Sequence, residues 1–305
     1  MDKSVNKYEW QDVESLIFDV ISIALNANGA YKMNYAENVQ IGQHEYEGIK
    51  LFSKIVYYLS FTGHDKAEEI ATELLKELKK FEHSFSVYIT NQVDLSQTRN
   101  GYVNNAIKLY KDISKYNRSN RGSASDKIDV LNFNYSLDDR FKDILDREID
   151  DNRLETWSNI HGIAHYEETP YYPAPIFGID SHGIVSRKDQ SDLRISFTKA
   201  YRVIENEINE MRDSSGYAGK DLITIYCHSL GAADYSYFEA IFDENDLYYS
   251  DCKIEYYYYP GEDDQEKLIK RQETITNLYN LLTDYGDNII NKLNLENRLS
   301  VIPSE

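Results

Sequence analysis

Polar side chains gather directly after four apolar runs of the sequence. Their amides, hydroxyls, carboxyls and imidazoles suit the binding of a small polar ligand, and glycines among them permit a close backbone approach. Each residue type also has a plainer interpretation, because Asn, Asp and His-Gly pairs are common in turns and caps. Their joint occurrence favours a pocket. The candidates are Asn132, Asn134, Tyr135 and Ser136 after the first run, His161 and Gly162 after the second, Gly178 and Asp180 after the third, and His228, Ser229 and Asp234 at the fourth.

Ser229 stands between an apolar run and a helical pattern, as the nucleophile of a serine hydrolase does. That motif has Gly two residues before the serine, where this chain has Cys227, and its histidine follows the serine in the chain. All seven histidines of this chain precede Ser229. The chain order therefore argues against an esterase.

Alternating elements are expected to position these side chains. Short apolar runs at 128–133, 159–161, 175–179, 222–227 and 254–259 alternate with helical patterns at 138–147, 191–212, 231–242 and 263–284. The alternation predicts an α/β fold with a mostly parallel sheet and helices on both faces. Such sheets bind ligands beyond the carboxyl ends of their strands, where the candidate residues lie.

The first part of the chain has a helical texture. Apolar residues recur at three- and four-residue steps within 10–24, and further helices are expected at 46–61, 65–89 and 104–116. The polar stretch 116–126 predicts a loop and a boundary. The predicted organisation is a helical subdomain over 1–115, a loop over 116–126 and the α/β core over 127–305.

Composition narrows the class of protein. The chain has 305 residues and a net charge of −19, which disfavours bulk electrostatic binding of nucleic acid or anionic lipid but leaves room for one small basic pocket. Two cysteines are too few for a structural zinc site or a disulfide framework, so no metal is expected. The start of the chain has acids where a signal peptide needs an apolar core, and no apolar stretch is long enough to span a membrane. A cytoplasmic protein without membrane contact is expected.

Several stretches, in order, resemble the AbiH family of bacteriophage abortive-infection proteins. They are the helix start at Trp10–Glu14, VLNFNYS at 130–136, NIHG at 159–162, PIFGID at 175–180, KAYR at 199–202 and IYCHSLGAADYSYFEAIF at 225–242. The resemblance spans about residues 10–285, and the last stretch is the most specific. That family is in turn similar to the SIR2-like proteins, whose Rossmann-type fold binds NAD. The order of Asn134-Tyr135-Ser136, His161-Gly162, Phe177-Gly178 and His228-Ser229 matches the order of the sirtuin motifs.

The resemblance implies a role for three residues. Asn134 would hold the nicotinamide ribose or orient the attacking water, His161 would be the general base, and Ser229 would contact the ribose or phosphate of the adenosine half. These side chains suit the chemistry, since cleavage of the nicotinamide–ribose bond needs a neutral imidazole near pH 7 and an amide that does not compete as a nucleophile. NAD hydrolysis in antiphage defence is the activity that follows.

The chain also departs from these families. The sirtuin zinc module is absent, Ser136 stands where sirtuins have an aspartate, and Cys227 replaces a glycine. Family members open with a strand and a Gly-Asn-Gly-Phe-Asp loop, and Met1 lies downstream of where that segment would be. Loss of a central strand would be too costly for a stable domain. Three explanations stay open: a late start codon or trimmed chain, a strand donated by a partner, and replacement by another segment such as 299–302.

Other functions compete with NAD hydrolysis. A non-catalytic nucleotide-binding sensor or scaffold of a defence complex is favoured by the missing glycine loop and by Ser136. A nuclease is disfavoured by the acidic charge and the lack of a carboxylate cluster for two metals. The expected ligand is a small nucleotide, with a second copy or a defence-complex subunit as the open protein partners. Lys199 and Arg202 are expected either on the exposed face of the 191–212 helix or, less readily, against an anion at the pocket mouth.

Overall fold

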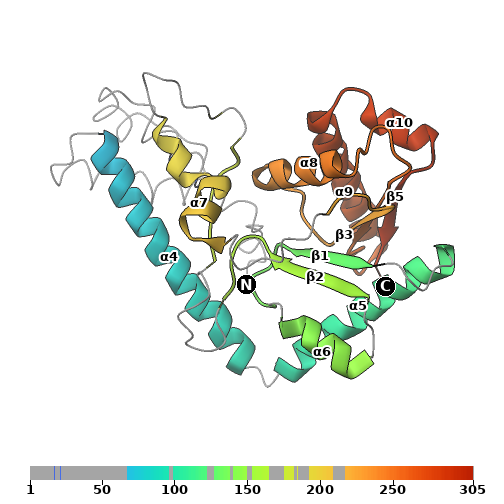
Figure 1. Ribbon diagram of the computed structural model, residues 1–305, viewed down its shortest axis with the longest axis horizontal. Helices are drawn as coiled ribbons and strands as arrows, with labels where there is room; N and C mark the ends of the chain where they lie inside the picture. The colour runs from blue at the N-terminus through green and yellow to red at the C-terminus, as the bar shows by residue number, and fades with distance from the viewer. Residues whose placement is uncertain are drawn as a thin grey trace. The chain divides into compact units, whose positions relative to one another are not determined.

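The structure is a computed structural model. It describes residues 17, 21, 67–95, 99–121, 127–137, 140–149, 153–164, 175–181, 184, 192–208 and 217–304. They form two compact units. We call Asp180, Ser181 and residues 217–304 the C-terminal unit, drawn mostly in orange and red in Figure 1, and the other described residues the β1–β2 unit. The chain divides elsewhere than at the predicted boundary 116–126, which falls inside the β1–β2 unit.

The β1–β2 unit contains one short strand–helix–strand (βαβ) motif. Strand β1 (Ile128–Asn132), helix α6 (Arg140–Ile149) and strand β2 (Leu154–Asn159) follow one another, and β1 and β2 pair in parallel (Figure 1). Their last residues, Asn132 and Asn159, are register partners. Both strands therefore end at the same edge. Helices α5 and α6 contribute to the core beneath, which contains Ile107, Tyr110, Phe141, Leu145, Leu154 and Trp157.

Strand β2 lies earlier in the chain than its apolar residues predict. The predicted run 159–161 begins where β2 ends, because only two residues of the strand, Leu154 and Trp157, are apolar. Thr156 and Ser158 are buried although both are polar. Thr156 donates a hydrogen bond of 2.7 Å to the carboxylate of its register partner Asp129, so burial of the hydroxyl is compensated.

Two long helices precede the first strand. Helix α4 (Ala67–Leu95) and helix α5 (Arg99–Arg121) confirm the helices predicted at 65–89 and 104–116. Helix α5 continues to Arg121, so the prediction that a loop begins at 116 was wrong. Of the helix predicted at 10–24, only Ile17 and Ile21 are described, and both are helical and buried. The helix predicted at 46–61 lies outside the described residues, and an N-terminal bundle stays a prediction.

The segment predicted as one helix over 191–212 is broken. A 3₁₀ helix η1 (Leu193–Phe197) is followed by Thr198 in extended conformation and then by helix α7 (Lys199–Glu205). Thr198 accepts a hydrogen bond from the amide of Tyr201 as the N-cap of α7, and it forms a parallel bridge with Ile179. Both contacts need the extended backbone that interrupts the helix. The predicted strand at 175–179 is reduced to this single bridge.

The C-terminal unit is a second parallel α/β layer. Strands β3 (Leu222–Tyr226), β4 (Lys253–Tyr258) and β5 (Leu299–Pro303) pair in the order β3-β4-β5, all parallel. Between them lie the 3₁₀ helix η3 (Ala232–Asp234) and helices α8 (Tyr235–Glu244), α9 (Asp264–Tyr285) and α10 (Ile289–Leu295). The core combines the strands and helices through buried residues that include Leu230, Phe242, Leu247, Ile254, Leu282 and Leu293.

The α/β alternation predicted from the sequence is confirmed, with a difference in the sheet. The described strands form two separate parallel sheets where one was expected. The segment 299–302, named above as one candidate for the place of the family's first strand, does form a strand, β5, which pairs with β4. Whether it takes the place of that strand stays a prediction.

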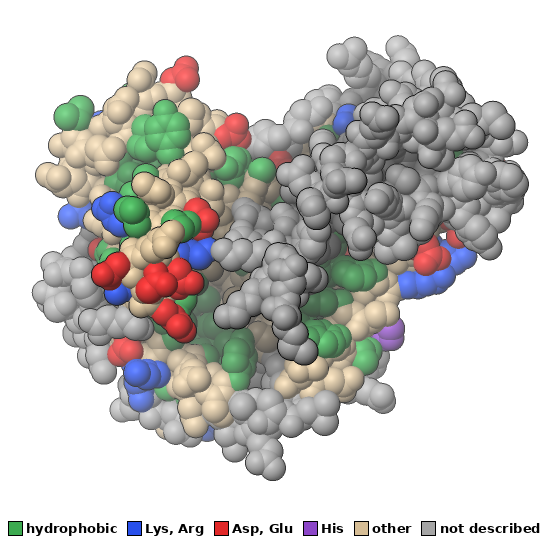
Figure 2. Space-filling view, turned by 180° about the vertical axis from the view of Figure 1, so that it is seen from behind, with side chains coloured by type: hydrophobic (Ala, Val, Ile, Leu, Met, Phe, Trp, Pro, Cys, Tyr) green, Lys and Arg blue, Asp and Glu red, His purple; other side chains and the backbone are tan. Residues whose placement is uncertain are grey.

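On the face that Figure 2 shows, acidic and basic side chains are interspersed, and the described atoms of that face form no broad basic patch. Among the residues that the structure describes, no helix is long and apolar enough to cross a membrane.

Truncation of a core side chain tests the packing of the β1–β2 unit. Leu145 on α6 is 0% exposed in the cluster around Trp157. Leu145→Ala is expected to lower the free energy of unfolding by about 2–5 kcal/mol, because it removes buried methyl groups and leaves a cavity. Urea denaturation measures the change. The neighbouring exposed substitution Asp146→Ala is expected to stay within about 0.5 kcal/mol of wild type, and an equal effect of both would contradict the packing described.

Candidate functional site

Two asparagine side chains shape the loop that follows β1. The Asn132 amide oxygen accepts from the backbone amide of Asn134 at 3.0 Å, and its nitrogen donates to the carbonyl of Leu137 at 3.0 Å. From the end of β2, the Asn159 amide donates to the carbonyls of Asn134 and Leu137 at 3.1 and 2.6 Å. Trp157 donates to the Asn159 amide oxygen at 3.1 Å. Asn132 is thus engaged inside the loop, and the loop conformation depends on both strands.

Asn134 differs from its neighbours in that loop. Its side chain is exposed, and the described residues give it no hydrogen-bond partner. The two residues that follow it form hydrogen bonds. Tyr135 donates to the carbonyl of Ile176 at 3.4 Å, and the hydroxyls of Ser136 and Tyr102 share a hydrogen bond. Of the residues predicted here, Asn134 therefore has the amide that is available to a ligand.

His161 lies two residues beyond the end of β2 and is buried. Its side chain is largely enclosed, with the residue only 2% exposed, and the ring contacts that of Phe133 edge to face with 5.6 Å between centroids. Its carbonyl accepts from the amide of Ile176 at 2.9 Å. Gly162 follows with a φ of 79°, a left-handed conformation that favours glycine.

Gly178 is required by the chain's own packing. A Cβ atom at this position would lie 2.7 Å from the carbonyl oxygen of Phe197 and 2.9 Å from the amide of Lys199. Ile179 and Phe197 are joined there by a backbone hydrogen bond of 3.0 Å. The close backbone approach predicted for a ligand is therefore made by the segment 197–199.

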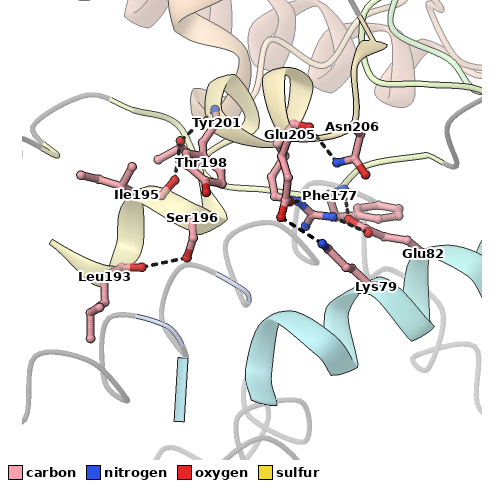
Figure 3. Close-up of polar contacts among 11 residues, drawn as sticks. Lys79, Glu82, Phe177, Leu193, Ile195, Ser196, Thr198, Tyr201, Glu205 and Asn206 are labelled. Atoms are coloured by element: carbon pink, nitrogen blue, oxygen red, sulfur yellow. Dashed lines mark hydrogen bonds and ion pairs between the residues drawn. The ribbon is translucent and has the colours of Figure 1, made fainter. Parts of the chain in front are cut away.

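A buried ion pair anchors the segment that contains Gly178. Glu82 of α4 accepts from the backbone amide of Phe177 at 2.8 Å with one carboxylate oxygen and from the guanidinium of Arg202 at 2.7 Å with the other (Figure 3). Glu82 and Arg202 are 3% and 0% exposed. Burial raises the pKa of the Glu82 carboxyl above its ordinary value, and the neighbouring Arg202 charge opposes that rise.

Arg202 and Lys199 are both buried, so the prediction of an exposed face was wrong. The reason is the break at Thr198, which turns α7 so that its first turn packs inward beside Gly178. Glu205 flanks the pair with a carboxylate oxygen 3.4 Å from Nε of Arg202, and Lys79 of α4 is 3.0 Å from the other oxygen. Figure 3 shows Lys79 and Glu82 pointing from α4 toward Glu205 and Phe177.

The C-terminal unit holds the other predicted residues. Asp180 accepts from both the amide and the hydroxyl of Ser236 in the first turn of α8. His228 accepts from the amide of Leu230 at 2.9 Å through Nδ1, and its Nε2 lies 3.3 Å from the carboxylate of Asp234. The structure thus joins Asp180 to α8 and joins His228 to Asp234, both through contacts within the unit.

Ser229 and Cys227 belong to the tight connection after β3. Cys227 and Leu230 have φ angles of 46° and 52°, and the carbonyl of Ser229 accepts from Asn277 at 3.0 Å. Cys227 is exposed, but desolvation by the surrounding groups raises the pKa of its thiol, which keeps it protonated at neutral pH. Because both ring nitrogens of His228 face other groups, this loop does not form a nucleophile–base pair with Cys227.

The predicted residues thus fall into two groups. Those after β1 and β2, together with Gly178, belong to the β1–β2 unit, whereas Asp180, His228, Ser229 and Asp234 belong to the C-terminal unit. Within the part of the chain that the structure describes, no group of three or more His, Cys, Asp or Glu side chains is arranged to hold a metal ion.

Sequence reasoning missed several residues of these networks. A sequence pattern could have identified Asn159, because β1 and β2 both end in an asparagine followed by an apolar residue. No sequence pattern identifies Glu82, because an acidic residue within a charged amphipathic helix is normally solvated. No sequence pattern identifies Ser236 either, since its hydrogen-bond partner Asp180 is far away in the sequence.

Comparison with known proteins adds no relatives: no protein-family model, curated protein or solved structure matches this chain. The resemblance described above therefore remains a prediction, and the function has to be argued from the residues.

Removal of the guanidinium tests the buried pair. Arg202→Met is expected to lower the free energy of unfolding by about 3–5 kcal/mol, because it leaves the Glu82 carboxylate buried without its counter-charge. Arg194→Met is a matched control, since Arg194 pairs with Asp192 at 2.6 Å near the surface and is expected to contribute about 1 kcal/mol or less. Similar losses in both variants, measured by urea denaturation, would contradict this account.

The same variant has a defined pH dependence. Without Arg202, burial raises the pKa of Glu82 in the folded state further, whereas the unfolded value is unchanged. The folded state then binds the proton more tightly, so stability falls as the pH rises through the interval between the two values. The stability of Arg202→Met relative to wild type is therefore expected to decrease as the pH rises above the ordinary pKa of a glutamate carboxyl. A flat or rising difference would contradict the buried carboxylate.

Proposed function

We propose that this protein acts in antiphage defence by hydrolysing NAD to nicotinamide and ADP-ribose, with a Rossmann-type, SIR2-like core. The observation that carries the proposal is the register of β1 and β2. Asn134 and His161 each follow, by two residues, an asparagine of the register pair Asn132–Asn159. An accessible amide and an imidazole therefore belong to the same edge of a parallel pair, which is where α/β proteins bind nucleotides.

The chemistry needs little more than these two groups. In the reaction the bond between ribose C1′ and the nicotinamide nitrogen breaks, nicotinamide leaves as a neutral base, and a water oxygen forms the new bond to C1′. The Asn134 amide, which the described residues leave unpaired, has the donors and acceptor to orient that water or a ribose hydroxyl. His161 accepts the proton that the water loses.

The fit to the adenosine half of NAD is weaker. A helix N-terminus attracts phosphate through its free amides. At α8, however, the amide and hydroxyl of Ser236 already bind the Asp180 carboxylate. A phosphate there would meet that negative charge, so we assign Ser229 and Asp234 no phosphate contact beyond the resemblance.

A second function is favoured by the burial of His161. A non-catalytic nucleotide-binding sensor or scaffold would use the exposed Asn134 for recognition and would need no accessible base. The 2% exposure of His161 and its contact with Phe133 suit such a role. In both functions the ligand is a small nucleotide, and a second copy of the chain or a defence-complex subunit stays open as the protein partner.

Nicotinamide release from NAD by the purified protein separates the two functions. His161→Ala is expected to lower the rate by about 10²–10⁴-fold, the usual contribution of a general base, and Asn134→Ala by about 10²-fold, as for the loss of a group that orients the reactants. Asn105→Ala and His83→Ala, at exposed positions of α5 and α4, are the matched controls and are expected to retain the wild-type rate. Melting temperatures of all variants identify any loss caused by unfolding.

The outcomes differ between the functions. Release by wild type that both site variants lose supports hydrolysis. Absence of release, together with a melting temperature that NAD raises in wild type and leaves unchanged in Asn134→Ala, supports the sensor. Neither release nor a shift in melting temperature overturns both.

A further inference from the structure

We propose that Glu82 is a positioning residue for the candidate site: through Phe177 and Tyr135 it determines where the Asn134 loop lies. The residue is on α4, far from β1 in the sequence, and it is not among the residues that the resemblance identifies. The functional meaning of this inference rests on the proposed NAD site, but the positioning itself is a property of the β1–β2 unit and can be measured without NAD.

The first link is the backbone of Phe177. Its amide donates to Glu82 at 2.8 Å, while the other Glu82 oxygen binds Arg202 at 2.7 Å. Both carboxylate oxygens are thus used, one on the 175–179 segment and one on α7. A buried carboxylate with two fixed donors has little freedom to move, because loss of either donor leaves a charged oxygen unsatisfied.

The second link is a cluster of aromatic rings. Phe177 contacts Phe81 and Phe85 of α4 at centroid distances of 5.2 Å each, and Tyr135 at 5.7 Å. Phe85 also meets Tyr135 edge to face at 5.6 Å. Tyr135 therefore packs against both the helix and the segment that Glu82 holds.

The third link connects the cluster to Asn134. The Tyr135 hydroxyl donates to the carbonyl of Ile176, the residue before Phe177, at 3.4 Å. Asn134 is the residue before Tyr135, so its exposed amide is carried by a backbone that this contact restrains. A displacement of Phe177 from Glu82 would move the anchor of the loop, whereas the contacts of Asn132 and Asn159 restrain the opposite side.

Glu205 provides a control of matched chemistry. It is a carboxylate beside the same Arg202, at 3.4 Å, and it also bonds Lys79 of α4. It has no hydrogen bond to the 175–179 segment in the structure, and its side chain is 30% exposed. Glu205→Gln therefore removes a charge from the same network without touching the proposed link.

Hydrogen exchange of the full-length protein tests the positioning. In Glu82→Gln one of the two carboxylate oxygens becomes an NH₂ group, which cannot accept, so the separate contacts to the Phe177 amide and to Arg202 cannot both persist and the negative charge is lost. Exchange in residues 176–178 and 133–137 is expected to accelerate at least about tenfold relative to the reference strand β4, as for the loss of a buried hydrogen bond to a charged group. Glu205→Gln is expected to leave both segments at the wild-type rate. Should Glu82→Gln be too unstable, Glu82→Asp keeps the charge but shortens the reach, and the same pattern is expected.

Kinetics then test the link to Asn134. If wild type hydrolyses NAD, Glu82→Gln is expected to lower kcat/KM about tenfold or more, and this loss is expected to vanish in the Asn134→Ala background, because Glu82 acts through that residue. A merely structural role would lower both backgrounds equally.

Each outcome decides the proposal. Equal exchange in Glu82→Gln and Glu205→Gln, or acceleration confined to 176–178 without 133–137, overturns it. Local acceleration of both segments supports it whether or not NAD is hydrolysed. Absence of turnover in wild type with that local acceleration rejects only the proposed function, so the two failures are distinguishable.

Discussion

The buried pair of Glu82 and Arg202 is the interaction on which the β1–β2 unit depends most. Two opposite charges that are nearly inaccessible to water are tolerated only if they stay together, since separation leaves a charge in a poorly polar interior. The pair joins α4 to α7, and the Phe177 amide adds the 175–179 segment to the same carboxylate. Three segments that are distant in the chain are thereby held by one side chain, and Gly178 permits the close packing that this needs.

Polar residues at the strand ends differ in their hydrogen bonding. Asn132 and Asn159 satisfy backbone groups of the loop between them, as expected for amides in turns. Asn134 is left with an exposed side chain by the same network. The first two amides therefore stabilise the loop, and the third lies exposed on it.

The C-terminal unit illustrates how internal groups compete with a ligand. Asp180 binds the first turn of α8, and His228 is held between Leu230 and Asp234. These contacts order the connection after β3, where Cys227 and Leu230 adopt left-handed backbone angles. They also fill hydrogen-bonding positions that a phosphate would use, which is why the NAD proposal rests mainly on the residues after β1 and β2.

The alternation of strands and helices, the long helices α4 and α5 and the polar strand ends could be predicted from the sequence, because these depend on local periodicity and on short polar clusters. The bounds of strand β2 were not predicted, because Thr156 and Ser158 are polar and yet buried. The hydrogen bond that compensates for burial of the Thr156 hydroxyl comes from the neighbouring strand β1. The break at Thr198, the burial of Arg202 and the hydrogen bond between Glu82 and Phe177 could not be predicted in this way, because they depend on tertiary contacts. Each of these joins residues far apart in the chain, and no local pattern records a partner at such separation.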